Sequence, residues 1–258
     1  QLAPFTHQLD HAARLQRWRE IHALSETALD TDAIEAAMAT YREALQRSPT
    51  DWMLHANFAR LAQLNGYPPV AEQHWRQVLE LMPHGLEAYY SLGNLLDSRG
   101  QSLEAVGYFN EALRRRPDLV EARNGLGLAL ANLGQTKQAL REYETAIRRK
   151  PEFAEAHVNL GQMLARQGRL PEARAQYELA LGCNANSAAA HINLGKLLAS
   201  QGQVQEAAVH YRLAIQARPN NAIAHSNLAN SLTALNDPAA ASHYAQAVKL
   251  QPDFAEAH

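Results

Sequence analysis

Asparagine recurs at one place in the chain at intervals of 34 residues or multiples of 34. The recurring residues are Asn57, Asn159, Asn193 and Asn227. A carboxamide offers two N–H donors and one oxygen acceptor, so it can bond both polar groups of one peptide unit. If one surface carries all of these side chains, that surface can do repeated hydrogen-bonding chemistry with a main chain.

Histidine recurs at the same interval, at His157, His191, His225 and His258, with His55 further back. Imidazole is a common metal ligand, so the row has the residue type of a metal site. Two nitrogens on one zinc ion must lie within about 3.5 Å of each other. Corresponding residues on neighbouring helices are separated by about 8–10 Å. We therefore expect these histidines to pack between helices, and we predict no metal site.

The interval belongs to a repeating pair of helices, which must position these side chains. Units begin at Trp52, Leu86, Val120, Ala154, Ala188 and Ala222. In the unit from Ala154, a first helix is predicted over about 154–167, with Leu160 and Leu164 on one face. Gly168 follows and fits a left-handed helix cap. Four other units also have glycine at this place, Gly66, Gly100, Gly134 and Gly202. The last unit has Asn236 there.

The second helix of each unit carries a small–aromatic–small stripe, such as Ala173, Tyr177 and Ala180. Small residues let two helices approach closely, and the aromatic side chain fills the space beside the contact. Proline follows the second helix in five of the six units, and Ala185 takes its place in the fourth, which begins at Ala154. Because proline cannot continue a helix, it marks the end of each unit.

This pattern resembles the tetratricopeptide repeat over residues 52–254. The resemblance implies an all-α fold, a right-handed superhelix (α-solenoid) of about seven helix-turn-helix units. It also implies that the first helices line a concave groove that binds peptides or proteins. Residues 1–51 are expected to be an amino-terminal segment with a degenerate capping repeat that carries the stripe Ala37-Tyr41-Ala44. Residues 52–254 are expected to form six consecutive units with one continuous core, and residues 255–258 are expected to begin a further repeat of a larger protein.

The asparagine row is similar to the ladder in the superhelical domains of O-linked N-acetylglucosamine transferases, which implies that it holds the main chain of an extended peptide. The predicted peptide-binding residues are Asn57, Arg60, Asn94, Asn159, Gln162, Arg166, Asn193, Lys196, Asn227 and Asn230. From their spacing, Arg166 and Lys196 could together hold one acidic side chain. The alternative is that the asparagines only hydrogen-bond to the adjacent repeat.

Composition points away from several other functions. The net charge is −2, with 24 basic and 26 acidic residues, so no electrostatic case exists for nucleic acid or an anionic membrane surface. No run of about 20 apolar residues predicts membrane insertion. The single cysteine, Cys183, excludes an internal disulfide framework. No nucleophile–base arrangement is evident, so we predict neither catalytic residues nor a cofactor.

The sequence therefore predicts a non-catalytic scaffold that binds an extended protein segment. Two alternatives stay open. The array could recruit substrates for an attached enzyme such as a glycosyltransferase, in which case a sugar-nucleotide-binding domain should be encoded next to it. It could also self-associate head to tail, because an open stack of repeats can add further copies at its ends.

Overall fold

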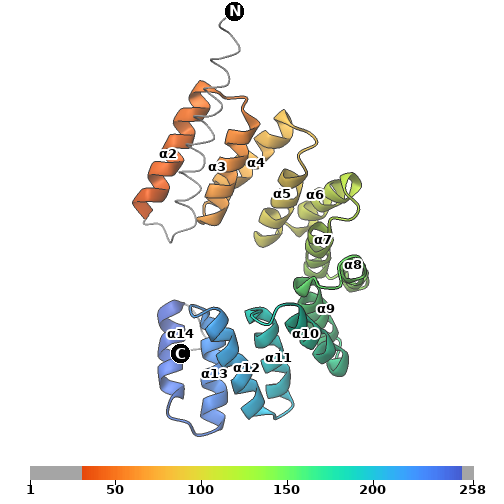
Figure 1. Cartoon of the computed structure of the whole chain (residues 1–258), viewed down its shortest axis with the longest axis vertical. Helices are drawn as coiled ribbons and strands as arrows, with labels where there is room; N and C mark the ends of the chain where they lie inside the picture. The colour runs from red at the N-terminus through yellow and green to blue at the C-terminus, as the bar shows by residue number, and fades with distance from the viewer. Residues whose placement is uncertain (1–30, 252–258) are drawn as a thin grey trace, which may run out of the picture. The chain divides into compact units, whose positions relative to one another are not determined.

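The computed structural model describes residues 31–251 of the chain (Figure 1). This range forms thirteen α-helices and no β-strand, which confirms the predicted all-α solenoid class. None of these helices combines the length and apolar character needed to cross a membrane. The first helix of the predicted capping repeat and the start of the further repeat lie outside the described residues.

The helices group into two compact units, a first that ends at Arg116 and a second that begins at Pro117. The helices of the first unit are α2 (Thr31–Arg47), α3 (Trp52–Leu64), α4 (Pro68–Leu81), α5 (Leu86–Ser98) and α6 (Ser102–Arg115). Helix α2 carries the predicted stripe and packs on α3, where the rings of Tyr41 and Phe58 stack with centroids 5.5 Å apart. The predicted single core over 52–254 stays a prediction.

The second unit contains four consecutive helical hairpins, and Figure 1 shows their helices in order. Its helices are α7 (Val120–Asn132), α8 (Thr136–Arg149), α9 (Ala154–Arg166), α10 (Leu170–Cys183), α11 (Ala188–Ser200), α12 (Val204–Ala217), α13 (Ala222–Ala234) and α14 (Ala240–Leu250). Two of the first helices begin with a side-chain cap: Ser187 accepts from the N–H of Ala190, and Asn221 from that of Ala224. Such caps satisfy N–H groups that have no partner inside the helix.

The turn inside each hairpin is left-handed, as the glycine positions predict. The five glycines have φ between 74° and 78°, and Asn236 takes the same region at 56°. In the α9–α10 hairpin the N–H of Arg169 bonds to the carbonyl of Leu164, which closes the end of α9 in a Schellman arrangement. A residue with a Cβ is strained at this φ, and asparagine tolerates it better than most.

In four hairpins, α5–α6 to α11–α12, the aromatic residue of the second helix lies against the residue that follows a recurring leucine of the first helix. This residue is glycine in all four. A Cβ built on Gly195 would lie 2.6 Å from Cε1 of Tyr211, and the same conflict occurs between Gly161 and Tyr177. The ring therefore occupies the space that any side chain would fill, and the Leu-Gly pair is explained by this contact.

Successive hairpins of the second unit pack through alanine. Ala146 of α8 clusters with Ala156 of α9, and Ala180 of α10 clusters with Ala190 of α11. All four side chains are fully buried. Small residues at these places let the second helix of one hairpin approach the first helix of the next.

The glycine–aromatic contact yields a stability prediction. Gly195→Ala should destabilise the protein by about 1–3 kcal/mol, because the new methyl group overlaps the Tyr211 ring in a packed interior. Gly182→Ala is the matched control: this glycine is also helical, and a Cβ added to it would meet nothing within 4 Å. The control should gain up to about 1 kcal/mol of helix propensity. Urea unfolding of both variants measures the difference, and equal changes would contradict the contact.

Candidate functional site

The first helices of the second unit form one layer. Helix α9 contacts both α7 and α11, and α11 also contacts α13, whereas contacts among the second helices are weaker. Closer approach among first helices places them on the inner side of this stack of hairpins. The predicted ligands Asn159, Asn193 and Asn227 lie on three successive members of this layer.

All three asparagines are half-buried, but their amides have different surroundings. Nδ2 of Asn159 donates to Oδ1 of Asn124 on the neighbouring helix α7, at 2.9 Å. The amide of Asn193 makes no hydrogen bond to another described residue. Nδ2 of Asn227 is buried and has no partner among residues 31–251. Inter-repeat hydrogen bonding thus accounts for one of the three amides.

In the first unit two of the three predicted residues, Asn57 and Arg60, are already engaged with each other. The guanidinium of Arg60 binds both carboxylate oxygens of Glu87, at 2.5 and 2.7 Å, and donates to Oδ1 of Asn57 at 2.7 Å. The hydrogen bond with Glu87 raises the pKa of Arg60 above its usual value. Asn94 is half-buried, and its amide has no hydrogen bond to another described residue. The structure thus joins Arg60 and Asn57 with Glu87, a residue that the sequence did not single out.

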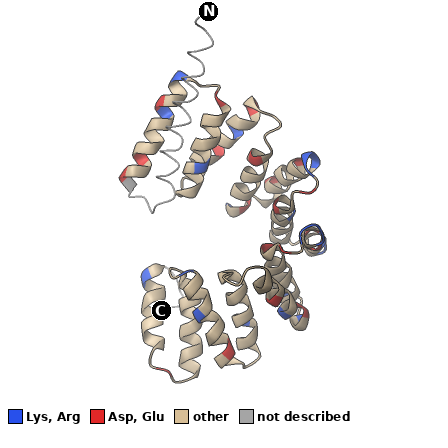
Figure 2. Cartoon of the chain, in the orientation of Figure 1, with Lys and Arg blue, Asp and Glu red and all other residues tan. Residues whose placement is uncertain are grey.

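The residues beside the asparagines of the second unit are polar and almost uncharged. Gln162 is half-buried, Lys196 is exposed, and the exposed Asn230 accepts a hydrogen bond from Tyr244 at 2.6 Å. Helix α13 contains no Asp, Glu, Lys or Arg, and α11 contains one such residue, Lys196 (Figure 2). Neither Arg166 nor Lys196 forms an ion pair with another residue in the described part of the chain.

A second set of polar contacts recurs in every hairpin and was not predicted from the sequence. The fourth residue of each first helix reaches back to the carbonyl of the loop residue six positions before it, at 2.9–3.2 Å. The six pairs are His55–Pro49, Tyr89–Pro83, Arg123–Pro117, His157–Pro151, His191–Ala185 and His225–Pro219. We call this side chain the loop anchor. It explains how Ala185 can replace proline, because the anchor uses only the carbonyl.

Each loop anchor also faces a residue of the second helix in its own hairpin. In five hairpins this residue follows the anchor by 19 positions, and in the last by 18. Arg123 binds Glu142 at 2.9 Å, and Nδ1 of His157 bonds to Gln176 at 2.7 Å. The recurrence of polar residues at this distance is a signal that the sequence contained. The packing role predicted for the histidine row is confirmed for the four described members, His55, His157, His191 and His225, which are buried.

The metal and thiol chemistry of the described residues is limited. Between residues 31 and 251, no three His, Cys, Asp or Glu side chains are grouped so that they could hold a metal ion. Cys183 is exposed, and its Sγ lies 3.7 Å from the carbonyl oxygen of Pro151.

Two family models match the sequence. One, described as a tetratricopeptide repeat, matches residues 57–120 and 124–188, which is half of the chain. The other, described as a TPR repeat, matches residues 195–236. The chain belongs to the tetratricopeptide repeat family. Tetratricopeptide repeats (TPRs) are generally modules of protein–protein interaction and typically non-catalytic.

Several solved TPR and TPR-like structures share the fold. The chain is similar to one in the APC/C hetero-tetramer Cut9–Hcn1, at 15% identity over 91% of this chain and 49% of that chain, with a TM-score of 0.72. It is similar to TTC0263, a TPR protein of Thermus thermophilus, at 22% identity over 70% of this chain and 99% of that one, with a TM-score of 0.64. PilF of Pseudomonas aeruginosa matches at 20% identity over 82% and 96%, with a TM-score of 0.65. No curated protein matches the sequence.

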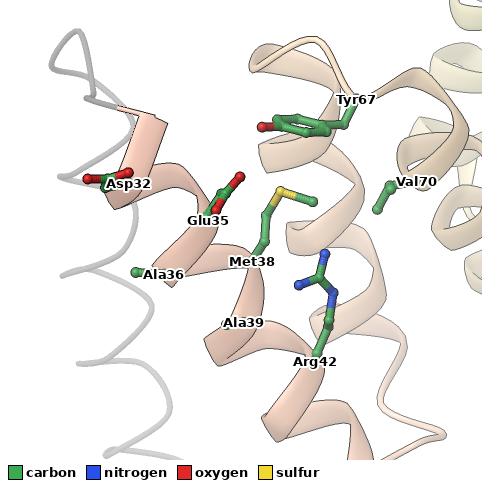
Figure 3. Close-up of a pocket in the computed structure, with 8 residues that line it drawn as sticks. All are labelled: Asp32, Glu35, Ala36, Met38, Ala39, Arg42, Tyr67 and Val70. Atoms are coloured by element: carbon green, nitrogen blue, oxygen red, sulfur yellow. The ribbon is translucent and has the colours of Figure 1, made fainter.

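A separate hollow lies in the first unit of the TPR array, between α2 and the start of α4 (Figure 3). Met38, Tyr67 and Val70 give it an apolar lining, while Asp32, Glu35 and Arg42 add two acidic side chains and one basic one. None of the predicted peptide-binding residues lines this hollow. It is therefore distinct from the asparagine row of the second unit.

The unequal surroundings of the three TPR asparagines predict unequal effects on stability. Asn159→Ala should cost about 0.5–1.5 kcal/mol, because it removes the bond to Asn124. Asn193→Ala and Asn227→Ala should change the free energy of unfolding by less than about 0.5 kcal/mol. Chemical unfolding of the three variants tests this, and similar losses at all three sites would show that all three amides are structural.

Proposed function

We propose that this TPR protein is a non-catalytic scaffold that binds an extended protein segment on the first-helix layer of its second unit. The observation that carries the proposal is the placement of Asn159, Asn193 and Asn227 on successive helices α9, α11 and α13. The amide of Asn193 and Oδ1 of Asn227 retain hydrogen-bonding capacity that no described residue uses, whereas Nδ2 of Asn227 is buried. A bound main chain has the N–H and C=O groups that would satisfy them.

The geometry of an extended chain supports the spacing. Neighbouring first helices pack at about 8–10 Å, and an extended chain advances about 3.3 Å per residue. One asparagine would therefore meet about every third residue of the ligand. Since main-chain bonds are blind to sequence, selectivity falls to the residues beside them, Gln162, Lys196 and Asn230, and to Arg166 at the end of α9.

The proposal is limited to the second unit because two of the three predicted first-unit residues, Asn57 and Arg60, are engaged. Asn57 and Arg60 already satisfy each other and Glu87. A ligand there would have to displace a bidentate ion pair, which is a charge-assisted contact. Binding at α3 and α5 is therefore less favoured than binding at α9, α11 and α13.

Binding by the asparagine row can be tested with a triple substitution. Peptides selected from a random display library on the full chain should lose at least about tenfold in affinity in the Asn159→Ala/Asn193→Ala/Asn227→Ala variant, which corresponds to about 1.4 kcal/mol. The matched control removes three exposed carboxamides from second helices, Gln138, Gln205 and Gln216. Fluorescence anisotropy measures both. Equal affinity for the triple variant and the wild type would remove the proposal.

The two basic residues make a separate prediction about ligand charge. The Arg166→Ala/Lys196→Ala variant should lose about tenfold in affinity for selected peptides that contain Glu or Asp, and little for uncharged ones. Added salt should weaken the acidic peptides selectively, because exposed charges are screened. Unchanged binding of the acidic peptides would rule out this role while leaving the asparagine row untouched.

A further inference from the structure

Three hairpins are closed by a pair of histidines. Nδ1 of the loop anchor lies 2.8 Å from Nδ1 of the second-helix histidine in α3–α4, and 3.0 Å in α11–α12 and α13–α14. The pairs are His55–His74, His191–His210 and His225–His243. We call the two members the anchor histidine and the outer histidine.

In each pair the two rings are oriented so that Nδ1 of one faces Nδ1 of the other. In α11–α12 the ring centroids are 5.3 Å apart and the two Nδ1 atoms 3.0 Å apart. The difference of 2.3 Å is about twice the distance from the centre of an imidazole to its nitrogen, so the two nitrogens lie on the line that joins the ring centres. Two nitrogens that share a metal ion converge on a third point instead. The geometry therefore fits one shared proton, N–H···N.

The loop carbonyl decides which ring supplies that proton. Nε2 of His191 lies 3.0 Å from the carbonyl oxygen of Ala185, which only accepts, so Nε2 carries a hydrogen. Neutral His191 then has a bare Nδ1, and His210 must donate from its own Nδ1. The same assignment, inferred from hydrogen-bond partners, holds for the other two pairs, where Nε2 faces the carbonyls of Pro49 and Pro219.

This arrangement limits how many protons a folded pair can bind. A first added proton goes to Nε2 of the outer histidine and leaves the N–H···N bond intact. A second would have to go to Nδ1 of the anchor histidine, so that two N–H groups face each other at about hydrogen-bond distance. In the unfolded chain both histidines are free to protonate near pH 6.5. Unfolding in acid therefore takes up at least one extra proton per pair.

Charged groups around the pairs are mixed and do not reverse this balance. Arg42 on α2 faces His74, and Arg212 on α12 faces His243, while Asp237 lies near His243 with the opposite sign. The surroundings of His210 contain one basic and two acidic residues, Arg174 and Glu178 on α10 and Glu206 on α12.

The α9–α10 hairpin is a natural contrast. Its anchor, His157, faces the side-chain oxygen of Gln176 at 2.7 Å and the carbonyl of Pro151 at 2.9 Å. A protonated His157 can donate from both nitrogens, one to each oxygen. This hairpin thus accepts a proton without losing a contact, although its backbone is the same.

We propose that the histidine pairs make their hairpins acid-sensitive switches, so that α11–α12 and α13–α14 open at mildly acidic pH while α9–α10 stays closed. The proposal does not depend on the proposed binding function.

The direction of the pKa changes agrees with it. Burial lowers the pKa of His74 to about 4, with His55 and Arg42 adding to the effect. Burial also lowers the pKa of His191, His210 and His243. A histidine whose pKa is lower folded than unfolded gives full stability above the unfolded value near 6.5, and that stability falls as the pH drops below it.

Hydrogen–deuterium exchange of the full chain tests the proposal. Exchange is compared at about pH 7.5 and about pH 5, each corrected for the intrinsic rate, where most carboxylates remain ionised at both. Excluding one proton per pair should lower protection in α11–α12 and α13–α14 by roughly 30-fold at the lower pH. Protection in α9–α10 should fall by less than about threefold.

Two reciprocal variants make the test specific. His210→Gln copies the α9–α10 partner into α11–α12 and should abolish the acid loss there, while α13–α14 keeps it. Gln176→His should create an acid loss of similar size in α9–α10. The proposal is wrong if protection in α11–α12 of the His210→Gln variant still falls by the wild-type amount at the lower pH. It is also wrong if wild-type α9–α10 loses as much protection as α11–α12. If one variant does not fold, the other still decides, because they alter different hairpins.

Discussion

The contact between an aromatic ring and the first helix sets the geometry of each hairpin. In four hairpins the ring lies where a Cβ would be, so glycine is required across from it. This close approach buries Tyr177 and Tyr211, and burial raises the pKa of both phenols to about 12. The close approach also determines which face of the first helix lies outside the core. Once the leucines and the glycine are buried, the asparagine beside them is held at the edge of the core, half-exposed.

Alanine contacts and loop anchors then connect one hairpin to the next. The alanines set how closely the helices approach, and the anchors hold the loop that joins two hairpins. Because the anchor is polar and the alanines are not, stacking is specified by both shape and hydrogen bonding. This division explains why the anchor can be His, Tyr or Arg while the alanines barely vary. These contacts also fix the order of the first-helix layer, since the asparagines lie two positions beyond the anchors.

Much of the fold follows from the 34-residue interval because helix ends, turns and core stripes depend on local residue type. The sequence predicts a helix end before Pro151, a left-handed cap at Gly168 and a buried stripe around Tyr177. The structure confirms all three. The interval did not predict the polar partners, because it gives the positions of the helices but not which side-chain atoms form hydrogen bonds. Arg60 has the residue type of a free ligand, but Glu87 holds it. Asn124 was overlooked because its counterparts in the other units are not asparagine.

The loop anchors also bear on how such a chain can grow. Each block whose first helix lies between α3 and α13 carries a side chain that bonds to a carbonyl oxygen in the linker before it, so each of these linkers supplies an acceptor for the block after it. Gene duplication in steps of whole blocks therefore copies donor and acceptor together. Because the anchor and its carbonyl lie six positions apart, an insertion between them would separate donor from acceptor, which favours growth by complete modules.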